Sequence, residues 1–363
     1  MRILRNLLTN TIFYLNPEEE KKILIAPLDW GLGHISRTIP IIKIMRERGH
    51  EVITCGNKIS YNIYKKEFSK IKHIEIQGYK PYYSKNESQK WVLIKQIPKF
   101  IKTIYYERKI AEKISLEQNV DIIISDNRFG FRSSKTINIY ITHQLKINGP
   151  ILLMKIVNIV NRQFIQKFDY CWVPDFKNSL LSGKLSKSSL EKTFIGPLSR
   201  FKTTVNKTKK YKYKYLAIIS GPEPQRSMFE DEIQNCFLKT NKHCAIISGQ
   251  TNTKEISSGK ISFYTHLETT AFKELITISE LVICRSGYSS IMDLYIMQKK
   301  VLFIPTPGQT EQEYLANYHL KTHSIYYQKQ GKIDLKKARF NFIQPKSETK
   351  KKLLKVAFDK VKL

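Results

Sequence analysis

The chain has 363 residues, 41% of them hydrophobic, and carries a formal net charge of +31. A single core rarely grows past ~250 residues, so this length predicts two domains. The charge comes from 49 Lys and only 13 Arg, and the usual nucleic-acid motifs are absent. Base and phosphate readers favour the Arg fork, so we favour a Lys-rich solvated surface and expect no nucleic-acid partner. Attraction to an anionic membrane surface stays open.

Two features indicate a cytoplasmic protein. The five cysteines form no C-x-x-C pair and mostly stand in apolar runs, as reduced thiols do. Residues 1–21 begin with "MRILRNLLTNTIFYL", which is too short and too polar to span a bilayer and lacks a clear cleavage site. We interpret 1–21 as an N-terminal extension, with an interfacial helix as the alternative.

From Lys22 onward, short apolar runs alternate with helical patterns. This succession predicts a parallel sheet covered by helices on both faces. The first series places a helix at 36–50 and strands at 22–28, 51–57, 72–78, 121–127, 137–144 and 170–175.

A charged linker at 199–210 interrupts the alternation, which then restarts. The second series places helices at 225–240, 269–279 and 288–298, and strands at 215–221, 243–249, 261–267, 280–287 and 300–307. We therefore predict an α/β chain of two Rossmann-like, doubly wound domains facing a cleft. We predict an acceptor-binding domain at 22–198, a nucleotide-sugar-binding domain at 211–345 and a basic helix at 346–363.

In open parallel sheets, ligands bind beyond the carboxyl ends of the strands. That rule selects residues far apart in sequence and predicts that the fold gathers them in the cleft. They are 29–34, Asp126, His143, 220–226, 285–290 and 306–312.

The stretch "PLDWGLGHISR", residues 27–37, joins a predicted strand to a predicted helix. It lacks the third glycine of the dinucleotide fingerprint, and the next strand end has no acidic residue, so a dehydrogenase is disfavoured. Asp29, Gly31 and Gly33 would form an acceptor loop, because glycines let a ligand approach the backbone. The helix start would lower the pKa of His34, which suits a general base. The alternative is a tight turn with a surface histidine.

The stretch "CRSGYSSIMDL" brings Arg285, Ser286 and Gly287 to the start of a helix, with Ser289 and Ser290 in its first turn. Exposed amides and hydroxyls there make an anion site, and Asp293 can accept from two sugar hydroxyls. A Ser-rich helix cap is the alternative. The following Pro-Gly loop offers hydrogen-bond partners for hydroxyls, or is only a polar turn; its polar residues are Gln309, Glu311 and Gln312.

This combination resembles the GT-B glycosyltransferases, most of all the MurG-like group and the allied "GLGHxxR" glycosyltransferases. The resemblance covers residues 22–37, 216–227 and 280–316. It implies that His34 is the base or an acceptor-loop residue and that Ser286 and Gly287 hold the diphosphate of a UDP-sugar. It further implies donor contacts from Ser220, Gly221, the backbone at Leu267, Asp293 in place of the family's Glu, and Gln312. Two loops depart from the family pattern and leave the sugar undetermined. The first, at 29–34, is bulkier than the family's, and the second, after Ser220, has Pro222, Glu223 and Pro224 in place of further glycines.

The resemblance implies an inverting transfer to an acceptor hydroxyl, with Arg285 or Arg226 and the helix start stabilising the leaving group. We expect no metal cofactor, because no Asp-x-Asp or His-rich cluster is evident. Asp126 and His143 are further candidates to orient His34 or to bind the acceptor; a capping Asp and a histidine at the edge of the core are the alternative. A UDP-sugar epimerase and a non-catalytic nucleotide-sugar-binding protein are the alternative functions.

Two basic, apolar segments, 79–109 and 149–168, suit a membrane interface and a lipid-linked or glycan acceptor. For 149–168 we favour a core helix with solvated Lys. We expect a cytoplasmic enzyme with the option of peripheral attachment to the inner face of the membrane.

Overall fold

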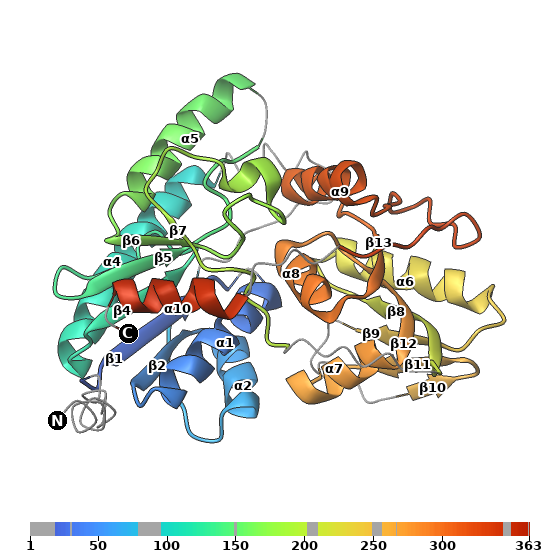
Figure 1. Ribbon diagram of the computed structural model, residues 1–363, viewed down its shortest axis with the longest axis horizontal. Coiled ribbons are helices and arrows are strands. Elements are labelled where there is room, and N and C mark those ends of the chain that lie inside the picture. The colour runs from blue at the N-terminus through green and yellow to red at the C-terminus, as the bar shows by residue number, and fades with distance from the viewer. Residues whose placement is uncertain are drawn as a thin grey trace, which may run out of the picture.

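The structure is a computed structural model that describes residues 19–29, 31–78, 96–148, 151–201, 210–248, 256–265, 267–343, 350–361 and 363. The predictions for 1–18, 79–95, 202–209 and 346–349 lie outside the described residues. Figure 1 shows two α/β units side by side, each built on one sheet. This arrangement confirms the predicted fold class.

The N-terminal unit contains a seven-stranded parallel sheet in the order β3-β2-β1-β4-β5-β6-β7. Its central strands are short Ile-rich runs that are buried on both faces, as parallel strands between helices should be. The strands are β1 Lys22–Pro27, β2 Glu51–Gly56, β3 Lys72–Glu75, β4 Ile122–Asp126, β5 Ile137–Ile141, β6 Tyr170–Val173 and β7 Thr193–Phe194.

The helices of this unit include α1 Leu32–Glu47, α2 Lys58–Glu67, α4 Ile97–Gln118 and α5 Ile151–Ile165. Helix α1 begins four residues earlier than expected, so His34 lies in its first turn and not in the connecting loop. Helix α5 differs from the core helix that we favoured, because Ile156, Ile159 and Val160 are exposed on it.

The C-terminal unit contains a six-stranded sheet in the order β10-β11-β9-β8-β12-β13, parallel except for β10. Its strands are β8 Tyr213–Ile218, β9 Cys244–Ile247, β10 Ile256–Ser258, β11 Ile261–Tyr264, β12 Ser279–Cys284 and β13 Lys300–Phe303. Its helices include α6 Gln225–Leu238, α7 Thr269–Thr277, α8 Tyr288–Met297 and α9 Thr310–His323. Helix α9 replaces most of the polar loop expected after β13, so Glu311 and Gln312 stand in its first turn.

The last helix, α10 Lys350–Lys360, packs on the N-terminal unit (Figure 1). The ring of Phe358 meets the edge of Trp172 with 5.6 Å between centroids. The guanidinium of Arg48 lies 5.0 Å from the Phe358 ring centroid and donates to the carbonyl of Leu363. The chain therefore crosses from one unit to the other twice.

Candidate active site

The two units meet where helices α1 and α8 begin. The hydroxyl of Ser289, in the first turn of α8, donates to the carbonyl of Gly33, in the first turn of α1, at 3.0 Å. Gly31 and Gly287 precede the two helices, and neither helix start has a side-chain cap. The first-turn amides of both helices are thus available to an anionic or hydroxylated ligand.

Beside this contact, His34 and Asp126 come together from α1 and the end of β4. Nδ1 of His34 lies 3.3 Å from Oδ2 of the wholly buried Asp126 carboxylate, and one fifth of the His34 side chain is exposed. Arg37, one turn further along α1, holds both Asp126 oxygens through Nε and Nη2. The strand-end rule identified His34 and Asp126, but Arg37 received no role because it stands inside a predicted helix.

A second group reaches this centre from across the interface. Nε2 of His143, after β5, lies 2.7 Å from Oε1 of Glu311 in α9, and the side-chain amide of Gln144 donates to the other Glu311 oxygen. The imidazole of His143 stacks on the Tyr288 ring, with 3.9 Å between centroids and an interplanar angle of 6°. Its Nδ1 lies 3.5 Å from Nη1 of Arg37. The predicted residues His34, Asp126, His143 and Glu311 thus belong to one connected group.

Charge and burial act in opposite directions on these groups. Burial alone would raise the pKa of Asp126, but Arg37 and His34 lower it to about 2. Burial lowers the pKa of His34, and the Arg37 charge lowers it further, whereas Asp126 raises it. The combined effect favours an ionised Asp126 and a neutral imidazole at neutral pH, the form of histidine that can accept a proton.

On the C-terminal side, the side-chain amide of Gln312 holds the loop after β13 in place. Oε1 of Gln312 accepts from the backbone amide of Thr306 at 2.9 Å, and its Nε2 donates to Oε1 of Gln309 at 2.5 Å. The hydroxyl of Ser286 donates to the Gln312 carbonyl at 2.8 Å. These contacts hold the β12–α8 and β13–α9 connections together, which places two predicted donor segments side by side.

Asp293, in the second turn of α8, accepts from the hydroxyl of Ser199 at 2.5 Å. Next to it, the guanidinium of Arg200 lies 4.4 Å from the Phe272 ring centroid, and its Nε is buried without a hydrogen-bond partner among the described residues. Asp293 and Glu67 interact electrostatically with Arg200. Sequence reasoning missed Arg200, which stands at the start of the predicted linker, where a single Arg between Ser and Phe gave no signal.

The two other predicted donor arginines are occupied within their own unit. Arg285 donates to the carbonyls of Ser220, Ile304 and Gln225 and to the side chain of Gln330. Arg226 pairs with Glu223 and Glu230. In this structure Arg285 therefore ties three loops together, and the charge of Arg226 is balanced by two carboxylates. This geometry differs from the expected direct contact of either guanidinium with a leaving group.

The remaining predicted residues have less distinctive surroundings. Gly221 has a φ of +117°, a backbone conformation that side chains rarely adopt. Leu267 is partly buried and packs against the main core, and Ser290 is partly exposed in the first turn of α8. Oδ1 of Asp29 is buried and has no hydrogen-bond partner in the part of the chain that the structure describes, which leaves an acceptor atom in the predicted acceptor loop.

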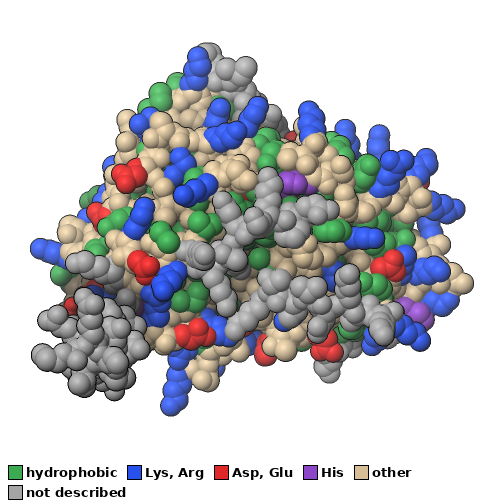
Figure 2. Space-filling model, viewed as in Figure 1, with side chains coloured by type: hydrophobic (Ala, Val, Ile, Leu, Met, Phe, Trp, Pro, Cys, Tyr) green, Lys and Arg blue, Asp and Glu red, His purple; other side chains and the backbone are tan. Residues whose placement is uncertain are grey.

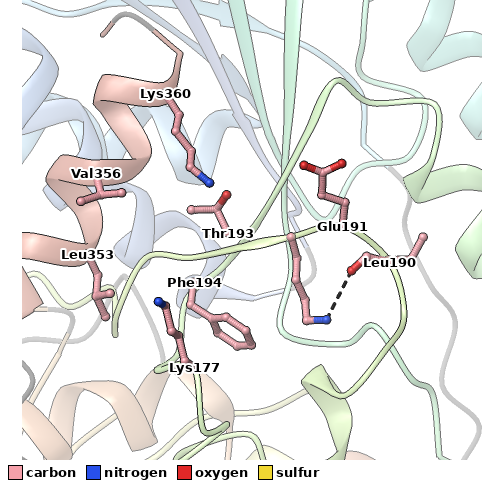
Figure 3. A pocket seen from close by; sticks show the side chains of 9 residues that line it. Lys177, Leu190, Glu191, Thr193, Phe194, Leu353, Val356 and Lys360 are labelled. Atoms are coloured by element: carbon pink, nitrogen blue, oxygen red, sulfur yellow. Dashed lines mark hydrogen bonds between the residues drawn. The ribbon is translucent and has the colours of Figure 1, made fainter.

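Neither of two surface pockets coincides with this centre. One, of about 580 Å³, lies between α10 and the segment around β7, with Lys177 and Lys360 on its sides (Figure 3). The other, of about 560 Å³, includes Gln225, Pro307 and Gln330, beside the loops that Arg285 holds. Within the described part of the chain, no group of three or more His, Cys, Asp or Glu is placed to hold a metal ion.

Comparison with known proteins found one matching family model and several solved structures of similar fold. Residues 223–337 match the model of the glycosyltransferase family 28 C-terminal domain. The glycotransferase of kitacinnamycin is 12% identical, with a TM-score of 0.58 over 86% of this chain and 87% of that one. SnogD from Streptomyces nogalater is 9% identical, with a TM-score of 0.59 over 88% of this chain and 89% of that one. MurG from Acinetobacter baumannii is 11% identical, with a TM-score of 0.50 over 94% of this chain and 91% of that one.

The fold is therefore that of the GT-B glycosyltransferases. The C-terminal unit adds the match to a glycosyltransferase family 28 domain, so fold and family model both support a glycosyltransferase. A search of curated proteins found no match.

Proposed function

We propose that the protein transfers a hexose or N-acetylhexosamine from a UDP-sugar to an acceptor hydroxyl. The contact between Ser289 and Gly33 carries this proposal. It brings the uncapped start of α8, within the segment that matches the family 28 domain, against the turn that holds His34. An anion site and a neutral histidine with a buried carboxylate behind it are the two parts that such a transfer needs.

The proposed donor site occupies the C-terminal unit. The amides and hydroxyls from Ser286 to Ser290 receive the diphosphate, together with the loop at Ser220 and Gly221. Asp293 accepts from the ribose hydroxyls, and the buried Nε of Arg200 beside it is a further donor for the nucleotide. The backbone at Leu267 reads the base, and Gln309, Glu311 and Gln312 face the sugar. Structures of the same fold hold UDP-L-rhamnose, in a protein from Arabidopsis thaliana, and thymidine diphosphate, in the rhamnosyltransferase SpnG.

In the proposed reaction, the acceptor oxygen forms a bond to the anomeric carbon while the bond from that carbon to the diphosphate oxygen breaks. The electron pair leaves with UDP, and the amides at the start of α8 stabilise the new charge. His34 takes the proton of the acceptor hydroxyl, and Asp126 stabilises the resulting imidazolium. Attack from the opposite face in one step inverts the anomeric configuration. No step requires a metal ion.

The acceptor side supports a membrane-bound substrate. Helix α4 exposes Ile97, Ile101 and Tyr105, which are spaced by one helical turn, and helix α5 exposes Ile156 and Ile159. Lys and Arg side chains are scattered over the visible face of both units, with fewer Asp and Glu side chains among them (Figure 2). Of the described helices, none is long and apolar enough to cross a membrane. We propose peripheral binding to an anionic, cytoplasm-facing membrane and a lipid-linked or cell-envelope glycan acceptor.

A donor screen tests the proposal. Thermal shift with UDP-GlcNAc, UDP-Gal, UDP-Glc and GDP-mannose should show stabilisation by at least one UDP-sugar. In a turnover assay, release of UDP from that donor should occur only when an extract that contains the acceptor is added. Epimerised donor formed without acceptor would indicate an epimerase instead. Binding without any turnover would indicate a nucleotide-sugar-binding protein. Stabilisation by none of the four donors would contradict the proposed donor site.

A further inference from the structure

Arg37 is the largest charged side chain buried beside the proposed base. It is 2% exposed and lies on α1 three residues after His34, so both side chains project from one face of the helix. Its Nε donates to Oδ2 of Asp126 at 2.6 Å, and its Nη2 donates to Oδ1. Nη2 also lies 2.8 Å from Nδ1 of His34, closer than the 3.3 Å between Nδ1 and Oδ2 of Asp126.

These distances determine where the proton of a neutral His34 resides. A guanidinium has only donors, so Nδ1 must accept in the shorter contact, and the imidazole proton then sits on Nε2. To take a proton from an acceptor hydroxyl at Nε2, the ring needs the other tautomer, in which Nδ1 donates to Asp126. That tautomer places two donors, Nδ1 and Nη2, against each other unless the guanidinium withdraws.

We propose that Arg37 is a positioning residue that holds the Asp126 carboxylate by both oxygens and sets which ring nitrogen of His34 carries the proton. The inference rests on the proposed role of His34 as the base and extends it to a residue that touches neither substrate. In the arrangement seen here, Nε2 of a neutral His34 carries the proton and is a donor. Its conversion to a base depends on the contact between Nη2 and Nδ1.

The same contact affects the charge of His34. The charged and titratable groups around the pair are Asp126 on β4, His143 after β5, Tyr288 on α8 and Glu311 on α9. Asp126 favours the imidazolium and Arg37 disfavours it. Loss of the Arg37 charge therefore raises the pKa of His34, so more imidazole is protonated at a given pH and less base is present.

Nitrogen NMR on protein labelled at histidine tests the proposal without requiring turnover. The His34 signals are assigned by their loss in His34→Gln. In the unmodified chain we expect the Nε2–H tautomer. In Arg37→Met we expect the Nδ1–H tautomer and an upward shift of the His34 pKa. Arg46→Met, an exposed substitution on the same helix, should leave both unchanged.

Two further variants separate the effect of the Arg37 charge from that of its forked guanidinium, and they keep the proposal testable if Arg37→Met does not fold. Arg37→Lys keeps the charge without the fork, so the tautomer should change while the pKa stays low. Arg37→Met/Asp126→Asn removes both buried charges, and the His34 pKa should return toward the value in the unmodified chain. The acid limb of the kcat/KM profile should move to higher pH in Arg37→Met, with KM for the donor unchanged.

An Nδ1–H tautomer in the unmodified chain would overturn the proposal. The proposal would also fail if Arg37→Met left both the tautomer and the pKa of His34 unchanged. It would fail, too, if the His34 pKa in the double variant were shifted from that of the unmodified chain as far as it is in Arg37→Met. If instead the NMR results hold and no UDP-sugar is turned over, the proposed function fails while the positioning role of Arg37 stands.

Discussion

The contact between Gly33 and Ser289 predicts a large effect from one methyl group. A Cβ added at Gly33 would lie 2.8 Å from the Ser289 hydroxyl oxygen and 3.1 Å from the Ser289 Cβ. The hydroxyl can rotate away only by giving up its hydrogen bond to the Gly33 carbonyl, worth ~0.5–1.5 kcal/mol. The crowding of the two Cβ atoms remains and costs ~1–3 kcal/mol. We therefore expect Gly33→Ala to disfavour the closed arrangement by roughly 2 kcal/mol, taken from the lower part of these ranges.

The assay is the initial rate of transfer from the UDP-sugar that the donor screen identifies. Roughly 2 kcal/mol corresponds to a fall in kcat/KM of about 30-fold. Gly31→Ala, in the same predicted acceptor loop, is the matched control, because no described residue beyond its chain neighbours lies within 4 Å of a Cβ at Gly31 and the residue has an extended φ of 169°. Adding Ser289→Gly to Gly33→Ala removes the crowding and should restore part of the rate. Equal rates for Gly31→Ala and Gly33→Ala would show that α1 and α8 do not meet in the working enzyme.

The other predictions concern the proposed chemistry. His34→Ala should lower turnover by ~10²–10⁴-fold, the usual contribution of a positioned base, with UDP affinity nearly unchanged in calorimetry; full turnover would instead make Asp126 or His143 the base. Asp293→Ala should weaken UDP binding by ~1.5–3 kcal/mol through loss of a charged acceptor, with Ser199→Ala as the control for its contact to the linker. Unchanged UDP affinity would remove Asp293 from the donor site. Turnover should survive EDTA, and an absolute requirement for Mg²⁺ or Mn²⁺ would reject leaving-group stabilisation by the α8 amides alone.

Local patterns were enough to predict the central strands of both sheets, because short Ile-rich runs between turn residues have few other solutions. They did not predict the short edge strand β7 or the antiparallel edge strand β10. The strand-end rule also selected His34, Asp126, His143 and Glu311, which lie in one connected group. Arg37 was missed because it stands inside a predicted helix, where a basic residue is expected to face solvent. Its burial depends on a carboxylate 89 residues away in the sequence, which no local pattern shows. Pro307 and Gly308 indicated a turn, and the polar residues after them were taken as part of the same loop. In the structure, helix α9 begins two residues after Gly308, at Thr310.

Contacts between the units away from these strand ends had no sequence signal. Glu67, at the end of α2, accepts from the amide of Thr269 at 3.0 Å and so caps α7 in the other unit. A capping pattern is local, and this cap is supplied from 202 residues away. The exposed side chains of α5 are likewise set by which neighbours the fold brings to the helix.

The return of α10 gives the C-terminal unit two attachments to the N-terminal unit, one through Ser199 and Arg200 and one through the helix that Arg48 and Trp172 hold. A body joined at one point can swing in any direction, whereas a body joined at two points rotates easily only about the line between them. The opening and closing of the cleft would then follow a single angular coordinate. Along it, the separation of Gly33 from Ser289 and that of His143 from Glu311 rise and fall together, so that one measured distance would report the state of the whole interface.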